Sequence, residues 1–499
     1  MKVYILNHPF HYEIENICRM FYPNAELKLV YAADDGDTGD RIVTELVKQG
    51  GYHYKATAFV GGRTCEEELT SEPCSDEQAE YDLALCLYRA LTRLTRVTPV
   101  WGMLTGVRPS KLMNTLIHEM GEENAQAYFQ QKLFVSEART RLALAVANAQ
   151  REIFAQNTPE SFSLYVSIPF CPSRCSYCSF VSHSITNANA KKLLAPYLDN
   201  LKKEIAAAGE TARQLGLRLE SVYFGGGTPG ILTAEQTDEL LTAIQTHFDC
   251  SPCREVTFEA GRADVITRDK LLTLKAHGVD RVSINPQTYD DAVLCAIGRR
   301  HTAQQAIDAF HLAEEIGFRT INTDLIAGLP GEAVSGFCAS LDQAVALGSQ
   351  NITVHALALK RSSRLVAQEN ADLNTDDTAR QMVDYANRTL REKGYIPYYM
   401  YRQSRCVGNL ENVGWCLPGH ECLYNVYMME ELHTVFGVGA GAVTRLKTPG
   451  VNYIERIFNF KYPYEYNSRF DELLLRKQRI SGFYREYHEK SREGGEAHV

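Results

Sequence analysis

The sequence has no long run of apolar residues, and this absence excludes several classes of protein. No stretch approaches the roughly eighteen apolar residues that a membrane-spanning helix needs. The N-terminus has no extended apolar segment like that of a secretory signal peptide, because Asn7, His8 and Pro9 interrupt the short apolar run before them. We therefore expect a cytoplasmic protein with no membrane span.

Cysteine and positive charge are also scarce. Fourteen cysteines among 499 residues are too few for a disulfide framework, and the cytoplasm keeps thiols reduced. The 52 Lys and Arg residues are outnumbered by 61 Asp and Glu residues, so the net charge is −9. Because nucleic-acid binding needs a basic face, we expect no nucleic-acid partner. The composition is otherwise that of a globular protein, and we expect a monomer.

The pattern of apolar residues divides the chain into three predicted regions. Residues 1–155 alternate strand-like and helical segments and are expected to form an N-terminal α+β accessory domain. Residues 156–371 form a core of a different type, and residues 372–499 an attached C-terminal α+β extension. No reaction chemistry is evident in the first region, so docking or covering a substrate is its expected role.

The core alternates short apolar strands with amphipathic helices. Its six predicted strands are 164–168, 221–224, 255–259, 281–284, 320–326 and 352–356. The helices between them are predicted at 190–215, 233–248, 267–277, 303–316 and 334–347. Strands joined through helices pair in parallel, and six are too few for the closed eight-stranded barrel. The predicted fold class is therefore α/β, a partial (β/α)6 barrel, with a doubly wound sheet as the alternative. In both, ligands bind at the carboxyl ends of the strands.

Three cysteines lie together on one loop directly after the first core strand. They are Cys171, Cys175 and Cys178, separated by three and two residues. Thiolates on one loop can converge on one metal centre, and soft sulfur ligands suit an iron–sulfur cluster or zinc. A [4Fe–4S] cluster normally takes four protein ligands, so three leave one iron open to a small molecule. Zinc is the alternative, because His183 would complete a Cys3His set.

A glycine-rich turn follows the second core strand. The segment Gly225-Gly-Gly-Thr-Pro229 allows backbone groups to approach a ligand closely, because glycine has no side chain. Such turns follow many strands, but here the turn follows the second strand, downstream of a three-cysteine loop that follows the first strand. The combination favours an iron–sulfur cluster over zinc.

In this order the motifs resemble those of the radical S-adenosylmethionine (SAM) superfamily. More closely, residues 160–450 are similar to the oxygen-independent coproporphyrinogen III oxidase group. The matching motifs are Tyr165–Cys171, Phe224–Pro229, Arg281–Gln287, Ile297–His301 and Asp324–Gly331. The N-terminal region, with Gly106-Val-Arg-Pro109, and the stretch 401–414 look like the coproporphyrinogen dehydrogenase HemZ branch of that group.

The resemblance implies a role for each motif, within a partial (β/α)6 radical SAM barrel. The three cysteines would ligate a [4Fe–4S] cluster whose open iron is chelated by the amino and carboxylate groups of SAM. An electron from the reduced cluster would cleave SAM into methionine and a 5′-deoxyadenosyl radical. One or two SAM molecules would be bound by Tyr165, Tyr177, Gly226, Gly227, Thr228, Glu259, Gln287, Arg299, Asp324 and Ala356. Within this set, Gln287, Arg299 and Asp324 match positions for a second SAM.

The implied substrate is coproporphyrinogen III or a related tetrapyrrole. Two of its propionate groups would lose their carboxyls as carbon dioxide and leave vinyl groups, with one SAM consumed for each. A low-potential donor such as flavodoxin or ferredoxin would supply the electrons. Because the substrate carries four carboxylates, cationic side chains are expected around it, and the candidates are Arg361, Arg364, Arg402 and Arg445.

Phe180 marks a departure from this group and keeps other functions open. The best-studied oxidases have a fourth cysteine at this position, two residues after the third. Relatives that bind heme also lack it, so a heme chaperone is the main alternative. The others are a radical SAM enzyme acting on another tetrapyrrole and a zinc-stabilised scaffold. The pair Cys250 and Cys253 is expected to lie in a turn rather than form a redox site.

Overall fold

The computed structural model describes residues 1–23, 25–32, 39–180, 182–358, 363, 365, 376–403, 406–448 and 453–493. The chain divides into two compact units. Unit 1 comprises residues 1–144 and 402–410, and unit 2 comprises residues 145–401 and 411–499. The three regions predicted from the sequence stay a prediction, and the predicted boundary at residue 371 lies outside the described residues. In the described ranges, no helix combines the length and the apolar character needed to cross a membrane.

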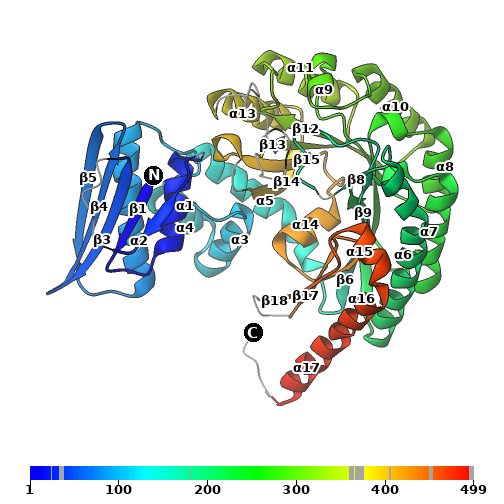
Figure 1. The fold of residues 1–499 in the computed structure, drawn as a ribbon, viewed down its shortest axis with the longest axis horizontal. Coiled ribbons are helices and arrows are strands. Elements are labelled where there is room, and N and C mark those ends of the chain that lie inside the picture. Colours follow the sequence, from blue (N-terminus) through cyan, green and yellow to red (C-terminus); the bar gives the residue numbers. More distant parts are fainter. Residues whose placement is uncertain are drawn as a thin grey trace. The chain divides into compact units, whose positions relative to one another are not determined.

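Unit 1 is built on a five-stranded sheet in the order β2-β1-β3-β4-β5. Its strands are β1 (Lys2–Leu6), β2 (Lys28–Val30), β3 (Arg41–Lys48), β4 (Tyr52–Val60) and β5 (Arg63–Ser71). Strand β1 is parallel to both neighbours, whereas β3, β4 and β5 form antiparallel pairs. Helix α2 (Asp76–Thr95) packs on β4 and β5 and against α1 (His11–Phe21), which buries one apolar face of the sheet (Figure 1).

The remaining helices of this part of the chain are α3 (Pro109–Met120), α4 (Glu122–Ala127), the π-helical turn η1 (Tyr128–Lys132) and α5 (Glu137–Ala155). Pro109 stands in the first turn of α3, where its missing N–H costs no hydrogen bond. The short helix η4 (Val407–Asn409) also belongs to unit 1.

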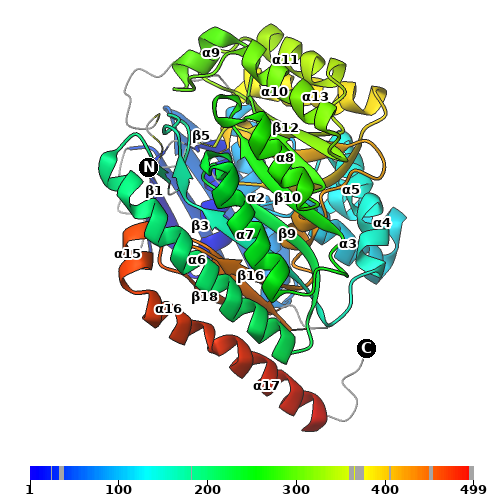
Figure 2. The ribbon, with the colours of Figure 1, turned by 90° about the vertical axis from the view of Figure 1, so that its right-hand side faces the viewer.

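Unit 2 contains six parallel strands that neighbour one another in chain order. They are β6 (Ser161–Ile168), β9 (Arg218–Gly226), β10 (Glu255–Gly261), β11 (Arg281–Ile284), β12 (Thr320–Ala327) and β13 (Asn351–Ala356). The connecting helices are α6 (Ala188–Gln214), α7 (Ala234–His247), α8 (Arg268–Ala276), α10 (Ala303–Ile316) and α11 (Val334–Ala346). They lie in an arc outside the strands (Figure 1), and Figure 2 shows α6, α7 and α8 side by side over the sheet. The predicted partial (β/α)6 barrel is confirmed.

Strands of the C-terminal region extend both ends of this parallel sheet. At one end β15 (Glu411–Cys416) pairs antiparallel with β13, and β14 (Ile396–Arg402) lies beyond it. At the other end β16 (Thr434–Val438) pairs parallel with β6, followed by β17 (Val443–Lys447) and β18 (Ile454–Phe458). The extension therefore covers the open edges of the barrel, which would otherwise present unpaired backbone groups.

The other described elements of unit 2 are short strands, turns and helices. They are β7 (Phe170–Cys171), β8 (His183–Ser184), η2 (Pro229–Ile231), η3 (Ala263–Val265), α9 (Asp291–Ala296), α13 (Asp376–Glu392), α14 (Leu423–Glu430), α15 (Pro463–Ser468), α16 (Phe470–Lys477) and α17 (Arg479–Glu493).

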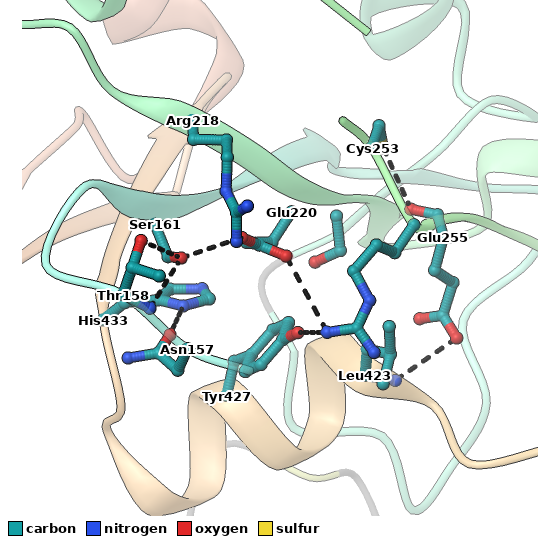
Figure 3. Close-up of polar contacts among 12 residues, drawn as sticks. Asn157, Thr158, Ser161, Arg218, Glu220, Cys253, Glu255, Leu423, Tyr427 and His433 are labelled. Atoms are coloured by element: carbon teal, nitrogen blue, oxygen red, sulfur yellow. Dashed lines mark hydrogen bonds and ion pairs between the residues drawn. The ribbon is translucent and has the colours of Figure 1, made fainter. Parts of the chain in front are cut away.

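Polar contacts link side chains at the amino-terminal edge of the parallel sheet (Figure 3). The buried carboxylate of Glu220 accepts a hydrogen bond from Ser161 Oγ at 2.8 Å and contacts Arg218, and it lies 3.8 Å from Arg254. These ionic and hydrogen-bonding partners offset much of the cost of burying the charge. This edge is thus held by contacts within the protein.

Glu255, at the start of β10, binds the first residues of helix α14 at the same edge of the sheet (Figure 3). Its carboxylate accepts hydrogen bonds from the backbone N–H groups of Leu423 and Tyr424, at 3.2 and 3.4 Å. The Cys422 thiol donates to it at 3.3 Å. The first N–H groups of a helix have no partner within the helix, so a carboxylate at this position stabilises α14.

Candidate functional site

The predicted site residues gather along the carboxyl-terminal edge of the six parallel strands. Gly226 ends β9, Glu259 lies near the end of β10, and Gln287 follows β11. Asp324 lies in the second half of β12 and Ala356 ends β13. Parallel strands carry these side chains to one edge because their carboxyl ends all point the same way.

The cysteine loop begins at β7 and folds back on itself. Strand β7, which contains Cys171, pairs with β8, and the N–H of Cys178 donates to the carbonyl of Cys175 at 3.3 Å. Cys171 and Cys175 are buried and Cys178 is half-buried. Burial raises the pKa of the Cys178 thiol to about 11, and the charges of the other two thiols add to this rise. The three thiols therefore lie near enough for the charges of Cys171 and Cys175 to act on Cys178.

The donor set of this loop is three cysteine thiols, soft ligands that suit a [4Fe–4S] cluster. Among the residues that the structure describes, no three His, Cys, Asp or Glu side chains are grouped closely enough to hold one metal ion. A [4Fe–4S] cluster asks for a different arrangement, because each thiolate binds its own iron. His183, the candidate fourth zinc ligand, instead packs its ring near Phe170 and Tyr462.

The glycine-rich turn after β9 packs directly on the cysteine loop. The N–H of Gly227 donates to the carbonyl of Ile168 at 2.9 Å, and that of Thr228 donates to the carbonyl of Phe170 at 2.8 Å. The Thr228 hydroxyl donates to Cys171 Sγ at 3.4 Å. A Cβ on Gly227 would lie 2.5 Å from the carbonyl oxygen of Phe170, so only glycine fits there. These residues therefore also position the cysteine loop, which the sequence did not suggest.

Arg299 joins the cysteine loop to the segment that follows β11. Its guanidinium donates to the Tyr177 hydroxyl at 3.0 Å and to the carbonyl oxygen of Asn285. It also interacts with the Cys175 thiol. Burial by itself would lower the pKa of this arginine, but Tyr177 and Cys175 reverse the effect and hold the guanidinium in its charged form.

Several buried polar atoms at this edge have no hydrogen-bond partner in the described part of the chain. They are Ser176 Oγ, Asn285 Oδ1 and Arg299 Nε. Most buried polar groups in proteins are hydrogen-bonded, and a group of unsatisfied ones is typical of a site that takes a polar ligand. Their place beside the cysteine loop fits a small polar molecule bound next to a cluster.

Glu259 borders a cluster of three stacked tyrosines, Tyr165, Tyr223 and Tyr424, called the tyrosine cluster below. The Tyr223 hydroxyl donates to Glu259 Oε1 at 2.5 Å. The Tyr223 ring stacks on Tyr424, with 4.4 Å between centroids, and Tyr165 stacks on both. Burial raises the pKa of Glu259 to about 7, although the bond from Tyr223 opposes that rise. The sequence analysis missed Tyr223 and Tyr424. Alternation along β9 would have placed Tyr223 on the face of Gly225, whereas α14 gives no local signal for Tyr424.

Asp324 has the buried partners that an aspartate inside an apolar strand requires. Asn322 Nδ2 donates to its Oδ1 at 2.8 Å, and His355 Nε2 lies 3.8 Å from its Oδ2. Burial raises the pKa of Asp324, but the contacts with His355 and Asn322 outweigh burial, so the net pKa is lowered. Asp324 is thus held as a carboxylate, and His355 is a site residue that the sequence analysis missed.

Gln287 and Ala356 are held in position by hydrogen bonds of their backbone N–H groups. Gln287 has a left-handed φ of 76°, and its N–H donates to the carbonyl of Asp324 at 3.0 Å. A non-glycine residue in this conformation is strained, and such strain is common at ligand sites. The N–H of Ala356 donates to Asn412 Oδ1 at 3.1 Å, so β15 fixes the end of β13.

The arginines proposed for substrate carboxylates differ in their surroundings. Arg361 and Arg364 lie outside the described residues. In unit 1, Arg402 donates from Nη1 and Nη2 to backbone carbonyls of Leu104, Gly106 and Asn409, so these two groups are engaged within that unit. Arg445, on β17, lies near the tyrosine cluster: burial raises the pKa of the Tyr424 phenol, and the charge of Arg445 opposes that rise.

Comparisons with known proteins agree with this geometry. The model of the radical SAM superfamily matches residues 165–344. The oxygen-independent coproporphyrinogen-III oxidase-like protein HemZ of Bacillus subtilis is 34% identical over 473 residues, which cover 92% of this chain and 93% of HemZ. The heme chaperone HemW of Lactococcus lactis is 29% identical over 283 residues, covering 56% of this chain and 68% of HemW.

The fold is also similar to that of a solved structure, coproporphyrinogen III oxidase HemN of Escherichia coli, described as a radical SAM enzyme. The TM-score is 0.52 at 23% identity, over 65% of this chain and 72% of HemN. Radical SAM proteins use a [4Fe–4S] cluster and SAM, which fits the three-cysteine loop and the unsatisfied polar atoms beside it. The chain therefore belongs to the radical SAM superfamily and, within it, to the family of the coproporphyrinogen-III oxidase-like protein HemZ.

Proposed function

We propose that this chain converts coproporphyrinogen III to protoporphyrinogen IX without oxygen, in heme and porphyrin biosynthesis. The observation that carries the proposal is the extent of the likeness to HemZ, which runs through 92% of this chain. The likeness to HemW covers 56% of the chain, so it leaves much of the molecule unaccounted for. In this proposal the protein is a monomeric, cytoplasmic enzyme whose substrate is a porphyrinogen.

In the proposed reaction, two propionate groups each lose one hydrogen atom, one electron and one carbon dioxide, and each becomes a vinyl group, while a separate one-electron acceptor takes up each released electron. When bound, the cluster and SAM supply the one-electron chemistry that removes the hydrogen atom. Cys171, Cys175 and Cys178 would hold the cluster, and Glu259 and Arg299 would orient SAM. A low-potential protein such as flavodoxin or ferredoxin would supply one electron for each SAM consumed.

Arg445 is the described arginine best placed to bind a substrate carboxylate, because it lies near the tyrosine cluster at the predicted SAM site. A guanidinium suits this role, since its planar fork can bind both oxygens of a carboxylate. The substitution Arg445→Gln should raise the KM for coproporphyrinogen III several-fold. An unchanged KM would remove Arg445 from the substrate site.

The proposal is tested on full-length protein purified without oxygen, reconstituted with iron and sulfide, and reduced in the presence of SAM. Mass spectrometry then counts 5′-deoxyadenosine and protoporphyrinogen IX with and without coproporphyrinogen III. We expect two molecules of 5′-deoxyadenosine for each protoporphyrinogen. The Cys175→Ser variant should lose cluster iron and both products, whereas Cys295→Ser, at an exposed cysteine, should keep all three. Formation of 5′-deoxyadenosine without porphyrinogen conversion would refute the substrate.

Heme delivery to another protein is the second candidate function. Two observations favour it: the likeness to HemW, and Phe180 at the position of the fourth cysteine of the best-studied oxidases. The Phe180 side chain is 68% exposed, so it is accessible to an apolar ligand. Tight binding of one heme per chain, together with no turnover of coproporphyrinogen III, would support this function over the first.

A further inference from the structure

We infer that Tyr223 is a positioning residue, which holds the Glu259 carboxylate in place to accept a hydrogen bond from SAM. The inference rests on the proposed function, in which Glu259 contacts SAM. It adds a residue that none of the sequence motifs contains, and it assigns a reason for the first glycine of the glycine-rich turn.

The pairing of strands brings Tyr223 and Glu259 together. Tyr223 on β9 is the register partner of Tyr165 on β6 and of Thr257 on β10. Glu259 follows Thr257 by two residues, so it lies on the same face of the sheet, diagonal to Tyr223. A tyrosine is long enough to reach a diagonal neighbour, and the hydroxyl donates to Glu259 Oε1 at 2.5 Å.

The neighbouring rings fix the direction of this hydroxyl. The centroid of the Tyr223 ring lies 4.4 Å from that of Tyr424, at an interplanar angle of 24°. It lies 6.3 Å from the ring centroid of Tyr165, at an interplanar angle of 21°. A ring held within such a stack cannot turn away without losing both contacts. The carboxylate of Glu259 is therefore bonded to a donor whose own position is set by packing.

Gly225 provides the space for this pair. A Cβ at this position would lie 3.0 Å from Tyr223 Cε1 and 3.3 Å from both Glu259 Oε1 and Tyr165 Cε2. These distances are shorter than ordinary contacts of a methyl group, so a side chain would displace the pair. The first glycine of the turn therefore serves the Tyr223–Glu259 pair, whereas Gly227 serves the cysteine loop.

The bond also favours the charged form of Glu259. The pKa of Glu259 is raised to about 7, mainly by burial; the bond from Tyr223 and the charge of His355 oppose this rise, and the charge of Asp324 adds to it. The titratable and charged groups that face Glu259 are Tyr165 from β6, Tyr223 from β9, Asp324 from β12, His355 from β13 and Tyr424 from α14. Without the hydroxyl of Tyr223, the carboxyl would be protonated over more of the neutral pH range.

The test measures SAM affinity by equilibrium dialysis between pH 6 and pH 9, with the anaerobically reconstituted full chain. Tyr223→Phe keeps the stacked ring and removes only the hydroxyl. We expect its affinity to be roughly tenfold lower than that of the wild type near pH 7, the value of one hydrogen bond to a carboxylate. At pH 9 the difference should be smaller, because Glu259 is then ionised in both proteins and only the positioning by the hydroxyl is lost. Glu259→Gln should bind SAM weakly at every pH. Its SAM affinity should not rise with pH, as that of the wild type does when Glu259 ionises.

A matched control is Tyr385→Phe, because Tyr385 also donates to a carboxylate, that of Asp342, on the exposed part of the molecule. Its affinity profile should equal that of the wild type. An unchanged profile in Tyr223→Phe would overturn the inference, whereas an equal loss at every pH would support positioning and exclude an effect on the ionisation of Glu259. A wild type that binds SAM with the expected pH dependence but converts no coproporphyrinogen III would support the inference and refute the proposed function.

Discussion

Glu255 and Glu259 lie on the same face of the same strand, β10, and have different surroundings. Glu255, at the amino-terminal end, accepts hydrogen bonds from two backbone N–H groups and one thiol of the segment that begins α14. Glu259, near the carboxyl-terminal end, accepts one from Tyr223, and burial raises its pKa to about 7. The same residue type thus stabilises the fold at one end of the strand and is left costly to ionise at the other.

The comparison shows how one sheet combines stability with binding. At the amino-terminal edge, the protein supplies donors for Glu255 and for one oxygen of Glu220, whose other oxygen lies 3.8 Å from Arg254. At the carboxyl-terminal edge it leaves Asn285 Oδ1 and Arg299 Nε without partners. Polar groups that the protein leaves unsatisfied lower its own stability but are available to a ligand. Substitutions at the two ends should therefore affect stability in opposite directions.

The largest expected effect is the loss of stability in Glu255→Ala. The substitution leaves buried N–H groups of Leu423 and Tyr424 without an acceptor, so the free energy of unfolding should fall by about 3 kcal/mol. Urea unfolding monitored by circular dichroism measures it, with Glu235→Ala, at an exposed glutamate, as the control. SAM affinity should be unchanged. A loss below about 1 kcal/mol would show that α14 does not depend on Glu255.

The next effect has the opposite sign: without SAM, Glu259→Gln should be more stable than the wild type at pH 8. Burial raises the pKa of Glu259 from 4.5 to about 7 in the folded protein. Between these values the folded state keeps a proton that the unfolded state releases, so the stability of the wild type falls as pH rises through this window. Glutamine does not ionise, and the gain at pH 8 should be roughly 2 kcal/mol.

Urea unfolding at pH 4 and pH 8 separates this effect from simple repacking. At pH 4 the carboxyl is protonated in both states, so Glu259→Gln and the wild type should differ little. An equal difference at both pH values would mean that the ionisation of Glu259 does not govern its effect on stability. The same variant should bind SAM poorly. A single substitution would therefore raise the stability at pH 8 and lower the affinity for SAM.

Much of this architecture could be predicted from the sequence because it depends on local patterns. The helix predicted at 233–248 is α7 (Ala234–His247), whose start is set by a capping box between Thr233 and Gln236. The spacing of Cys171, Cys175 and Cys178 likewise identified a loop that begins at β7, which pairs with β8, and whose cysteines are buried or half-buried.

The features that were not predicted depend on contacts between segments distant in the sequence. Tyr424 reaches the site from α14, and His355 meets Asp324 across two neighbouring strands. The pairing of β16 with β6 also has no local signal, because any exposed strand edge offers the same backbone groups. Sequence patterns therefore identified the elements and singled out the three-cysteine loop, but not the side chains brought together around Glu259.

The smallest expected effect concerns Phe180, near the cysteine loop. Its side chain is 68% exposed, so Phe180→Ser should change the free energy of unfolding by less than about 0.5 kcal/mol. Phe180→Cys restores the fourth cysteine of the best-studied oxidases. Because three thiols already leave one iron open for SAM, its iron content should equal that of the wild type. Weaker SAM binding would show that a fourth thiolate can displace SAM from the open iron.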